Sequence, residues 1–182
     1  MDVTLAVLVA IGVVGFFLVL VVLRSFHSIG PSEVGLVAKR IGTRSKGDQL
    51  VALRGEAGYQ ADLLMPGLRF KLWPIFKVER YDWVQVPPGQ IGLVIAQVGA
   101  ALPTGAKSAV YHPEAGNFAD LRVFLETGGQ RGVQRPVLPP GTTAPIHPVG
   151  FVVITSDATF GKVVSDATAA AFLANPADAP GW

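Results

Sequence analysis

Hydrophobic and polar positions divide the chain into one long apolar run and a series of short apolar segments. The long run covers residues 3–23 without a charge and lies between Asp2 and Arg24. A helix of about 20 residues rises roughly 30 Å, which is the thickness of the hydrocarbon core of a bilayer. The pattern therefore predicts a membrane-spanning helix at residues 3–23, within an anchor region that covers residues 1–28.

A cleaved secretory signal peptide is the alternative interpretation of this run. The chain opens without basic residues, the run exceeds the roughly 7–15 residues of a signal's apolar region, and no small-residue cleavage site follows it. We therefore favour a retained, single-pass anchor. Arg24, Lys39 and Arg40 follow the span and no Lys or Arg precedes it, so the positive-inside rule predicts a cell-membrane protein with a cytoplasmic C-terminal domain.

The short apolar segments are typical of β-strands separated by turns. Residues 90–98 are apolar at nearly every position and residues 149–155 form a similar run, as expected of strands covered on both faces. Residues 68–86 predict two strands, with an edge, break or bulge at Pro74. The chain's 21 glycines and 14 prolines also favour short strands and turns over a helical bundle.

Two blocks of this β-rich part recur along the chain. Residues 29–42 match residues 86–99 at an offset of 57, and residues 55–74 match residues 129–148 at an offset of 74. The shared positions are mainly Gly and Pro, which constrain the backbone rather than supply chemistry. Because the offsets differ by 17, the second copy carries about 17 additional residues between its two blocks.

The repeat predicts two similar β-rich units, at residues 29–85 and 86–156, followed by an Ala-rich tail at residues 157–182. Gly35 and Gly92 take matching places in the first strong strand of each unit and indicate a bulge or a close approach of two backbones. Together with the N-terminal transmembrane helix and short helices in the units, this organisation predicts the α+β fold class.

One helix is expected among the additional residues of the second unit, at residues 118–126. Asn117 is a suitable N-cap, and two glycines after the helix provide a stop signal. Its apolar face consists of Phe118, Leu121, Phe124 and Leu125. That face covers either its own unit, which we favour, or a neighbouring copy. A second short helix is expected in the tail, at Ser165–Ala174.

Composition and charge exclude several kinds of chemistry. The chain has no cysteine and therefore no disulfide, thiolate metal site or cysteine nucleophile. A formal net charge of +2 with scattered Lys and Arg does not indicate nucleic-acid binding. No nucleophile elbow, phosphate-binding loop, dinucleotide fingerprint or zinc-ligand spacing occurs. We therefore expect no enzyme activity, no cofactor, and no catalytic, cofactor-binding or metal-binding residues.

The histidines and three aromatic residues are further candidates for function. The histidines lie far apart, without Glu or Cys at metal-ligand spacing, and we expect them to be solvated or turn-capping. They are His27, His112 and His147. Three aromatic residues form either a membrane-facing patch or, as we favour, part of the strand-packed core. They are Trp73, Tyr81 and Trp83.

The first block, "PSEVGLVAKRIG" followed by "MPGLRFKLWP", resembles the opening of the stomatin, prohibitin and flotillin (SPFH, or band 7) domain, which also follows an N-terminal membrane segment. The second copy is most similar to bacterial flotillin-like proteins. The resemblance covers residues 29–155 and includes no catalytic residues. The matching positions are Pro31, Glu33, Gly35, Val37, Gly42, Pro66, Gly67, Leu68, Phe70 and Pro74.

The resemblance implies a membrane-attached α+β domain that assembles into large rings or cages and organises membrane microdomains or membrane protein complexes. Its implied partners are the lipid bilayer, further copies of the chain and other membrane proteins. Family members continue into a long helical region, so this chain is expected to be a short or truncated member. The alternative is a single-pass accessory or adaptor subunit of an envelope transport complex.

Overall fold

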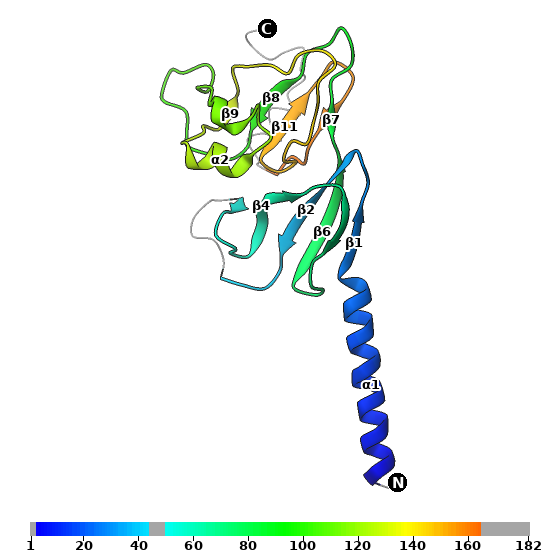
Figure 1. Cartoon of the computed structure of the whole chain (residues 1–182). Coiled ribbons are helices and arrows are strands. Elements are labelled where there is room, and N and C mark those ends of the chain that lie inside the picture. The colour runs from blue at the N-terminus through cyan, green and yellow to red at the C-terminus, as the bar shows by residue number, and fades with distance from the viewer. Residues whose placement is uncertain (1–2, 44–49, 165–182) are drawn as a thin grey trace.

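The computed structural model describes residues 3–43 and 50–164 and consists of a long helix joined end-on to a β-rich domain (Figure 1). Helix α1 (Val3–Arg24) is long and apolar enough to cross a membrane, and the β domain buries none of its most apolar stretch. The predicted N-terminal helix and the mostly β domain that follows it are therefore present, and the fold class is α+β.

The part of the β domain nearest to α1 contains a four-stranded sheet and a two-stranded ribbon. The sheet has the order β3-β4-β2-β6, and the ribbon pairs β1 with β5. All pairs are antiparallel except β3 with β4. The strands are β1 (Phe26–Ile29), β2 (Glu33–Lys39), β3 (Val51–Ala52), β4 (Gly58–Leu64), β5 (Gly67–Phe70) and β6 (Phe76–Asp82).

The part of the β domain farther from α1 repeats this combination with shorter strands. Its four-stranded sheet has the order β12-β11-β8-β9, and its ribbon pairs β10 with β7. The strands are β7 (Val84–Gln85), β8 (Leu93–Ala96), β9 (Gly132–Val133), β10 (Thr143–Ala144), β11 (Phe151–Ile154) and β12 (Thr159–Phe160). The apolar runs at residues 90–98 and 149–155 thus contain the strands β8 and β11, which pair antiparallel.

Gly35 and Gly92 have matching surroundings. Each lies where a Cβ atom would come within 3.2 Å of three apolar side chains of the segments around it. These side chains are Ile29, Leu64 and Val78 around Gly35, and Val86, Leu138 and Val153 around Gly92. Ile29 and Val86 are related by the offset of 57, and Leu64 and Leu138 by the offset of 74. Both glycines thus lie where neighbouring side chains leave no room for a Cβ atom.

Gln60 and Gln134, which the offset of 74 also relates, make the same hydrogen bonds. Each Nε2 donates to the carbonyl oxygens two and four residues earlier, at 3.0 and 2.8 Å for Gln60 and at 2.9 and 2.8 Å for Gln134. Ala52 pairs with Gln60 in parallel, as Ala109 does with Gln134. The additional residues of the second copy therefore lie between Ala109 and Gln134, where the structure places η1 (Pro113–Ala115) and α2 (Leu121–Glu126).

Helix α2 begins three residues later than the sequence predicts. Asn117 and Phe118 have positive φ angles of 53° and 70°, so neither continues a right-handed helix. Asp120 is the N-cap and its carboxylate accepts a hydrogen bond from the Val123 amide at 3.0 Å. The prediction of a helix at 118–126 with an Asn117 cap is wrong at its start, because side-chain capping by Asp120 competes successfully with capping by Asn117.

The apolar face of α2 covers its own part of the β domain. Phe118, Leu121 and Phe124 are buried, and the rings of Phe118 and Phe124 pack edge-on against Phe151 of β11 at centroid distances of 5.3 and 4.9 Å. Leu125 is partly buried against the same cluster. This cluster also includes Leu36 of β2, so one continuous core joins the two sheets.

Two further expectations concern the three aromatic residues and the helix in the tail. Trp73 precedes β6, whereas Tyr81 and Trp83 lie at and after its other end, so the three aromatic residues do not form one patch. Tyr81 packs partly buried against the core, as favoured, whereas Trp73 and Trp83 do not belong to the core cluster or pack against it. The helix expected at Ser165–Ala174 lies outside the described residues.

Candidate functional site

Two polar regions of the described structure are candidates for function. The first, which we name the inter-sheet seam, joins the sheet around β2 to the sheet around β8. The second, which we name the anchor junction, joins α1 to the turn between β5 and β6.

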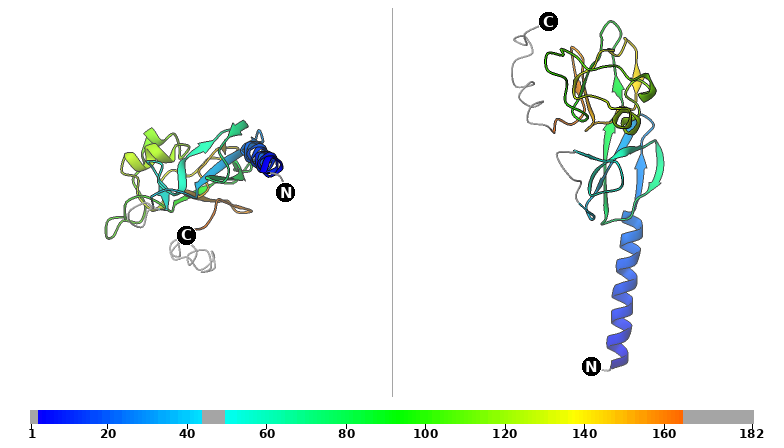
Figure 2. Two further views of the ribbon diagram at one scale, coloured as in Figure 1. Left: turned by 90° about the horizontal axis from the view of Figure 1, so that it is seen from below. Right: turned by 90° about the vertical axis from the view of Figure 1, so that its left-hand side faces the viewer.

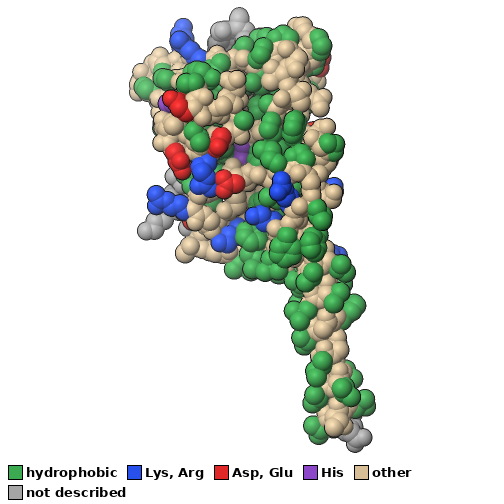
Figure 3. Space-filling model, viewed as in Figure 1, with side chains coloured by type: hydrophobic (Ala, Val, Ile, Leu, Met, Phe, Trp, Pro, Cys, Tyr) green, Lys and Arg blue, Asp and Glu red, His purple; other side chains and the backbone are tan. Residues whose placement is uncertain are grey.

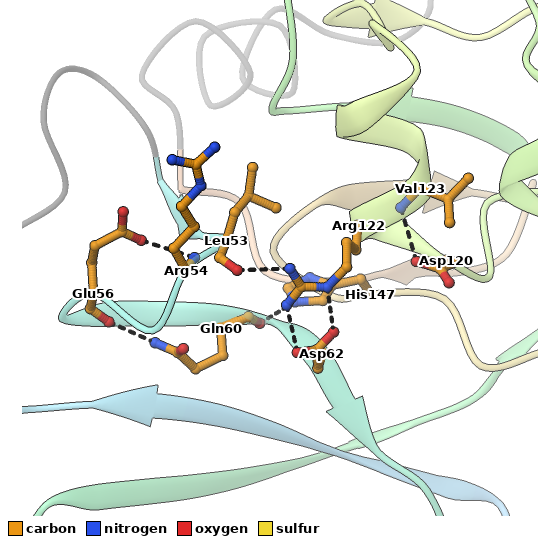
Figure 4. Close-up of polar contacts among 9 residues, drawn as sticks. All are labelled: Leu53, Arg54, Glu56, Gln60, Asp62, Asp120, Arg122, Val123 and His147. Atoms are coloured by element: carbon orange, nitrogen blue, oxygen red, sulfur yellow. Dashed lines mark hydrogen bonds and ion pairs between the residues drawn. The ribbon is translucent and has the colours of Figure 1, made fainter.

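A bidentate ion pair holds α2 against β4 in the inter-sheet seam (Figure 4). The Arg122 guanidinium donates to the Asp62 carboxylate at 2.6 and 3.0 Å, and its third contact is the Leu53 carbonyl oxygen at 2.7 Å. The hydrogen bond from Arg122 lowers the pKa of Asp62 and raises that of Arg122. Because the pair is largely exposed, it positions α2 more than it stabilises the fold.

His147 is the buried centre of the same seam. Its Nδ1 accepts hydrogen bonds from the amides of Val149 at 3.2 Å and Gly150 at 2.9 Å, while Nε2 lies 3.0 Å from the Gln60 carbonyl oxygen. Since Nδ1 accepts and Nε2 faces an acceptor, the neutral ring carries its proton on Nε2. Burial lowers the pKa of His147 to about 4, so the ring is neutral at pH 7.

Lys162 closes the far side of the seam. Its Nζ donates to the Tyr59 hydroxyl at 2.8 Å, lies 3.4 Å from the Glu79 carboxylate and stands 5.1 Å from the Tyr59 ring centroid. The hydrogen bond to Tyr59 raises the pKa of Lys162. The buried Gln97 side chain also donates to the Lys162 carbonyl oxygen at 2.8 Å, which ties this last described segment to the core.

The anchor junction depends on Ser25, which is fully buried. Its Oγ donates to the Val21 carbonyl oxygen at 2.6 Å and accepts from the Trp73 amide at 3.0 Å. Its carbonyl oxygen accepts from the Lys71 amide at 2.9 Å. Because β1 begins at Phe26, helix and β domain are joined without a linker, and the turn between β5 and β6 is held beside the end of α1 (Figure 2).

The three histidines occupy separate environments. His27 lies on β1, His112 precedes η1 and packs edge-on against Phe124, and His147 lies in the seam. His147 caps a turn, as expected, but its full burial was not predicted. Within residues 3–43 and 50–164, no cluster of three metal-ligating side chains occurs.

Sequence reasoning missed the Arg122–Asp62 pair and the bond from His147 to Gln60. The partners are 60 and 87 residues apart, and neither pair has a local sequence signal. A cavity of about 300 Å³ also lies between the sheets and the end of α2. Its wall consists of Leu50, Val51, Leu53, Val98, Gly99, Ala100, Leu125, Gly128, Gly129 and Arg131.

The polar groups of the seam are bonded to one another or to the backbone, and the described residues that line the cavity include no carboxylate or imidazole. The arrangement can hold the two sheets and α1 in fixed relation. Comparison of the chain with protein-family models, curated proteins and solved structures gives no match to any of them.

Proposed function

We propose that this chain is a non-enzymatic, single-pass membrane scaffold of the flotillin-like (SPFH) kind. In this proposal α1 anchors the chain in the cell membrane and the β domain lies on the cytoplasmic face. Copies of the chain assemble there and organise membrane microdomains or membrane protein complexes.

The observation that carries the proposal is the anchor junction. A domain tethered by a flexible linker samples a large volume. Here Ser25 is buried, and its side chain and carbonyl oxygen bind the turn at Lys71 and Trp73. A β domain held in this way stays next to the bilayer, which suits a protein that acts laterally on its membrane neighbours.

Within this proposal, residues 29–85 and 86–156 are two SPFH-like β units of similar construction. The matching surroundings of Gly35 and Gly92 and the matching hydrogen bonds of Gln60 and Gln134 support this division. The units share one core and therefore act as one body.

Exposed sheet edges support assembly of several copies. Strand β6 ends the first sheet, and β12 ends the second. Unpaired backbone groups on such edges are available to pair with a neighbouring chain. The rival proposal, an adaptor subunit of an envelope transport complex, calls for a long helical hairpin between β domains. In residues 50–164 the only α-helix is α2, which has six residues.

Three measurements on the full chain test the proposal. Alkaline carbonate should leave the protein in the membrane if α1 is an anchor. Protease added to intact cells should spare the β domain and digest it after lysis if the domain is cytoplasmic. Chemical cross-linking in the membrane should give a ladder of multimers. Release by carbonate, or a chain that stays monomeric, contradicts the scaffold.

A further inference from the structure

Apolar side chains are exposed around the point where α1 leaves the β domain. They come from the start of β1, the segment after β2, the end of β5 and the following turn. They are Phe26, Ile41, Phe70 and Leu72, and they are 47%, 61%, 54% and 38% exposed. In Figure 3, hydrophobic side chains at this end of the β domain continue those of the helix. We name this surface the proximal end.

Basic residues surround these apolar side chains. Residues 24–27, 38–43 and 69–77 form the proximal end and contain no Asp or Glu. Their basic members are Arg24, Lys39, Arg40, Arg69, Lys71 and Lys77. The register of β2 and β6 explains this distribution of charged residues. At the end near α1, Lys39 pairs with Phe76, whereas at the far end Glu33 pairs with Asp82. Basic groups thus predominate near the helix, where Glu79 is ion-paired with Lys77 at 2.6 Å, and Glu33 and Asp82 lie at the opposite end of the strands.

The corresponding end of the second unit is an interface. The offset of 74 relates Leu72 and Trp73 to Ile146 and His147. Ile146 is only 4% exposed and His147 is fully buried, with its Nε2 against Gln60 of the first unit. The same end of the unit is therefore covered by protein in the second copy and uncovered in the first.

We propose that the proximal end docks on the headgroup region of a bilayer that contains anionic phospholipids. The inference rests on the proposed anchoring by α1 and adds the surface and the lipid chemistry. Ser25, one residue beyond α1, binds Lys71 and Trp73 directly, so Leu72 lies at the level where the helix leaves the hydrocarbon core. Apolar side chains ringed by Lys and Arg match an interface with phosphate groups above acyl chains.

The absence of cysteine from the chain allows single reporter cysteines. Ile41→Cys and Phe70→Cys carry an environment-sensitive fluorophore, and Val110→Cys, equally exposed on the second unit, is the matched control. The labelled full chain is reconstituted into phosphatidylcholine vesicles with or without about 30 mol% phosphatidylserine. We expect blue-shifted emission and quenching by spin-labelled lipid at positions 41 and 70, stronger with phosphatidylserine, and neither effect at position 110.

A charge-reversed chain separates lipid recognition from simple proximity. Lys39→Glu with Arg40→Glu and Lys71→Glu should lower the phosphatidylserine preference by about tenfold, and about 0.5 M salt should lower it in the unaltered chain. Thermal unfolding of the reversed chain is measured alongside, because Lys39 also donates to the Gly55 carbonyl oxygen at 2.6 Å and Lys71 lies over the Phe76 ring. If it unfolds, Arg40→Gln alone replaces it and should give a smaller loss in the same direction.

These experiments distinguish failure of lipid docking from failure of the proposed membrane scaffold. Extraction by carbonate contradicts anchoring by α1 and this inference with it. An anchored chain whose probes at 41 and 70 stay in water, or whose quenching ignores phosphatidylserine, overturns only this inference. Cross-links between copies through Ile41→Cys, with no lipid quenching, show that a second copy covers this end and also overturn it.

Discussion

The His147 ring donates a hydrogen bond from Nε2 to the carbonyl oxygen of Gln60, 87 residues earlier in the chain, at 3.0 Å. Because Nδ1 accepts two amide hydrogen bonds at the same time, the ring is held on both sides by backbone of different sheets. Protonation of Nδ1 would replace two favourable contacts by repulsion between donors. The joint between the sheets therefore depends on a neutral imidazole.

Acid should weaken this joint. The folded pKa of His147 is about 4 and its unfolded value about 6.5, so unfolding takes up a proton below pH 6.5. The contribution of the neutral ring to stability is complete above pH 6.5 and is lost as the pH falls toward 4. At pH 4 the loss amounts to about 3 kcal/mol. Denaturant unfolding across this range should show the loss.

His147→Gln should lower stability at pH 7 and flatten its dependence between pH 6.5 and pH 4. His112→Gln, at a partly exposed ring outside the seam, is the control and should keep the parent's dependence. Equal pH dependence in the parent and in His147→Gln would show that this ring is not the titrating group.

Leu121→Asp should destabilise the folded monomer. Leu121 is 1% exposed and packs against Gly150, so the carboxylate would be forced into the core without a partner, at a cost of about 3–5 kcal/mol. The measurement is the melting temperature in detergent, with the surface variant Val110→Asp as control. A normal melting temperature with loss of cross-linked multimers would instead place Leu121 at an interface between copies.

Alanine at Gly35 or Gly92 should cost similar amounts of stability. In both places the new Cβ meets three apolar side chains within 3.2 Å. Overpacking should therefore lower the free energy of unfolding by about 1–3 kcal/mol. Gly30→Ala is the control, because the nearest atoms to its new Cβ all belong to the flexible Glu33 side chain. A clear loss at one glycine and none at the other would argue against equivalent units.

Ser25→Ala should loosen the anchor junction without unfolding the β domain. The change deletes the hydrogen bond to the Val21 carbonyl oxygen and leaves the Trp73 amide without its acceptor, at a cost of about 1–2 kcal/mol. Hydrogen exchange should be faster at Trp73 than in the parent. Ser28→Ala, at an exposed serine of β1, should leave that rate unchanged, and protection retained in Ser25→Ala would mean that Oγ does not hold the turn.

Local patterns in the sequence determined the features that depend on near neighbours in the chain. The length and apolarity of residues 3–23 predicted α1, because a lipid phase requires a hydrogen-bonded helix of that span. Gly and Pro positions predicted turns and the recurring blocks, since Pro fixes φ and Gly adopts the positive φ angles that turns require. Gly128 ended α2 as expected, with φ of +82°.

Tertiary structure alone decided the rest. The start of α2 moved to Leu121 because Asp120 bonds the Val123 amide while Phe118 turns into the core with positive φ. Arg122 meets Asp62, and His147 meets Gln60, because strand order brings distant segments together, and that order depends on packing of the whole core. The proximal end has the same origin, since its basic and apolar residues are scattered along the chain until the strand registers gather them at one end of α1.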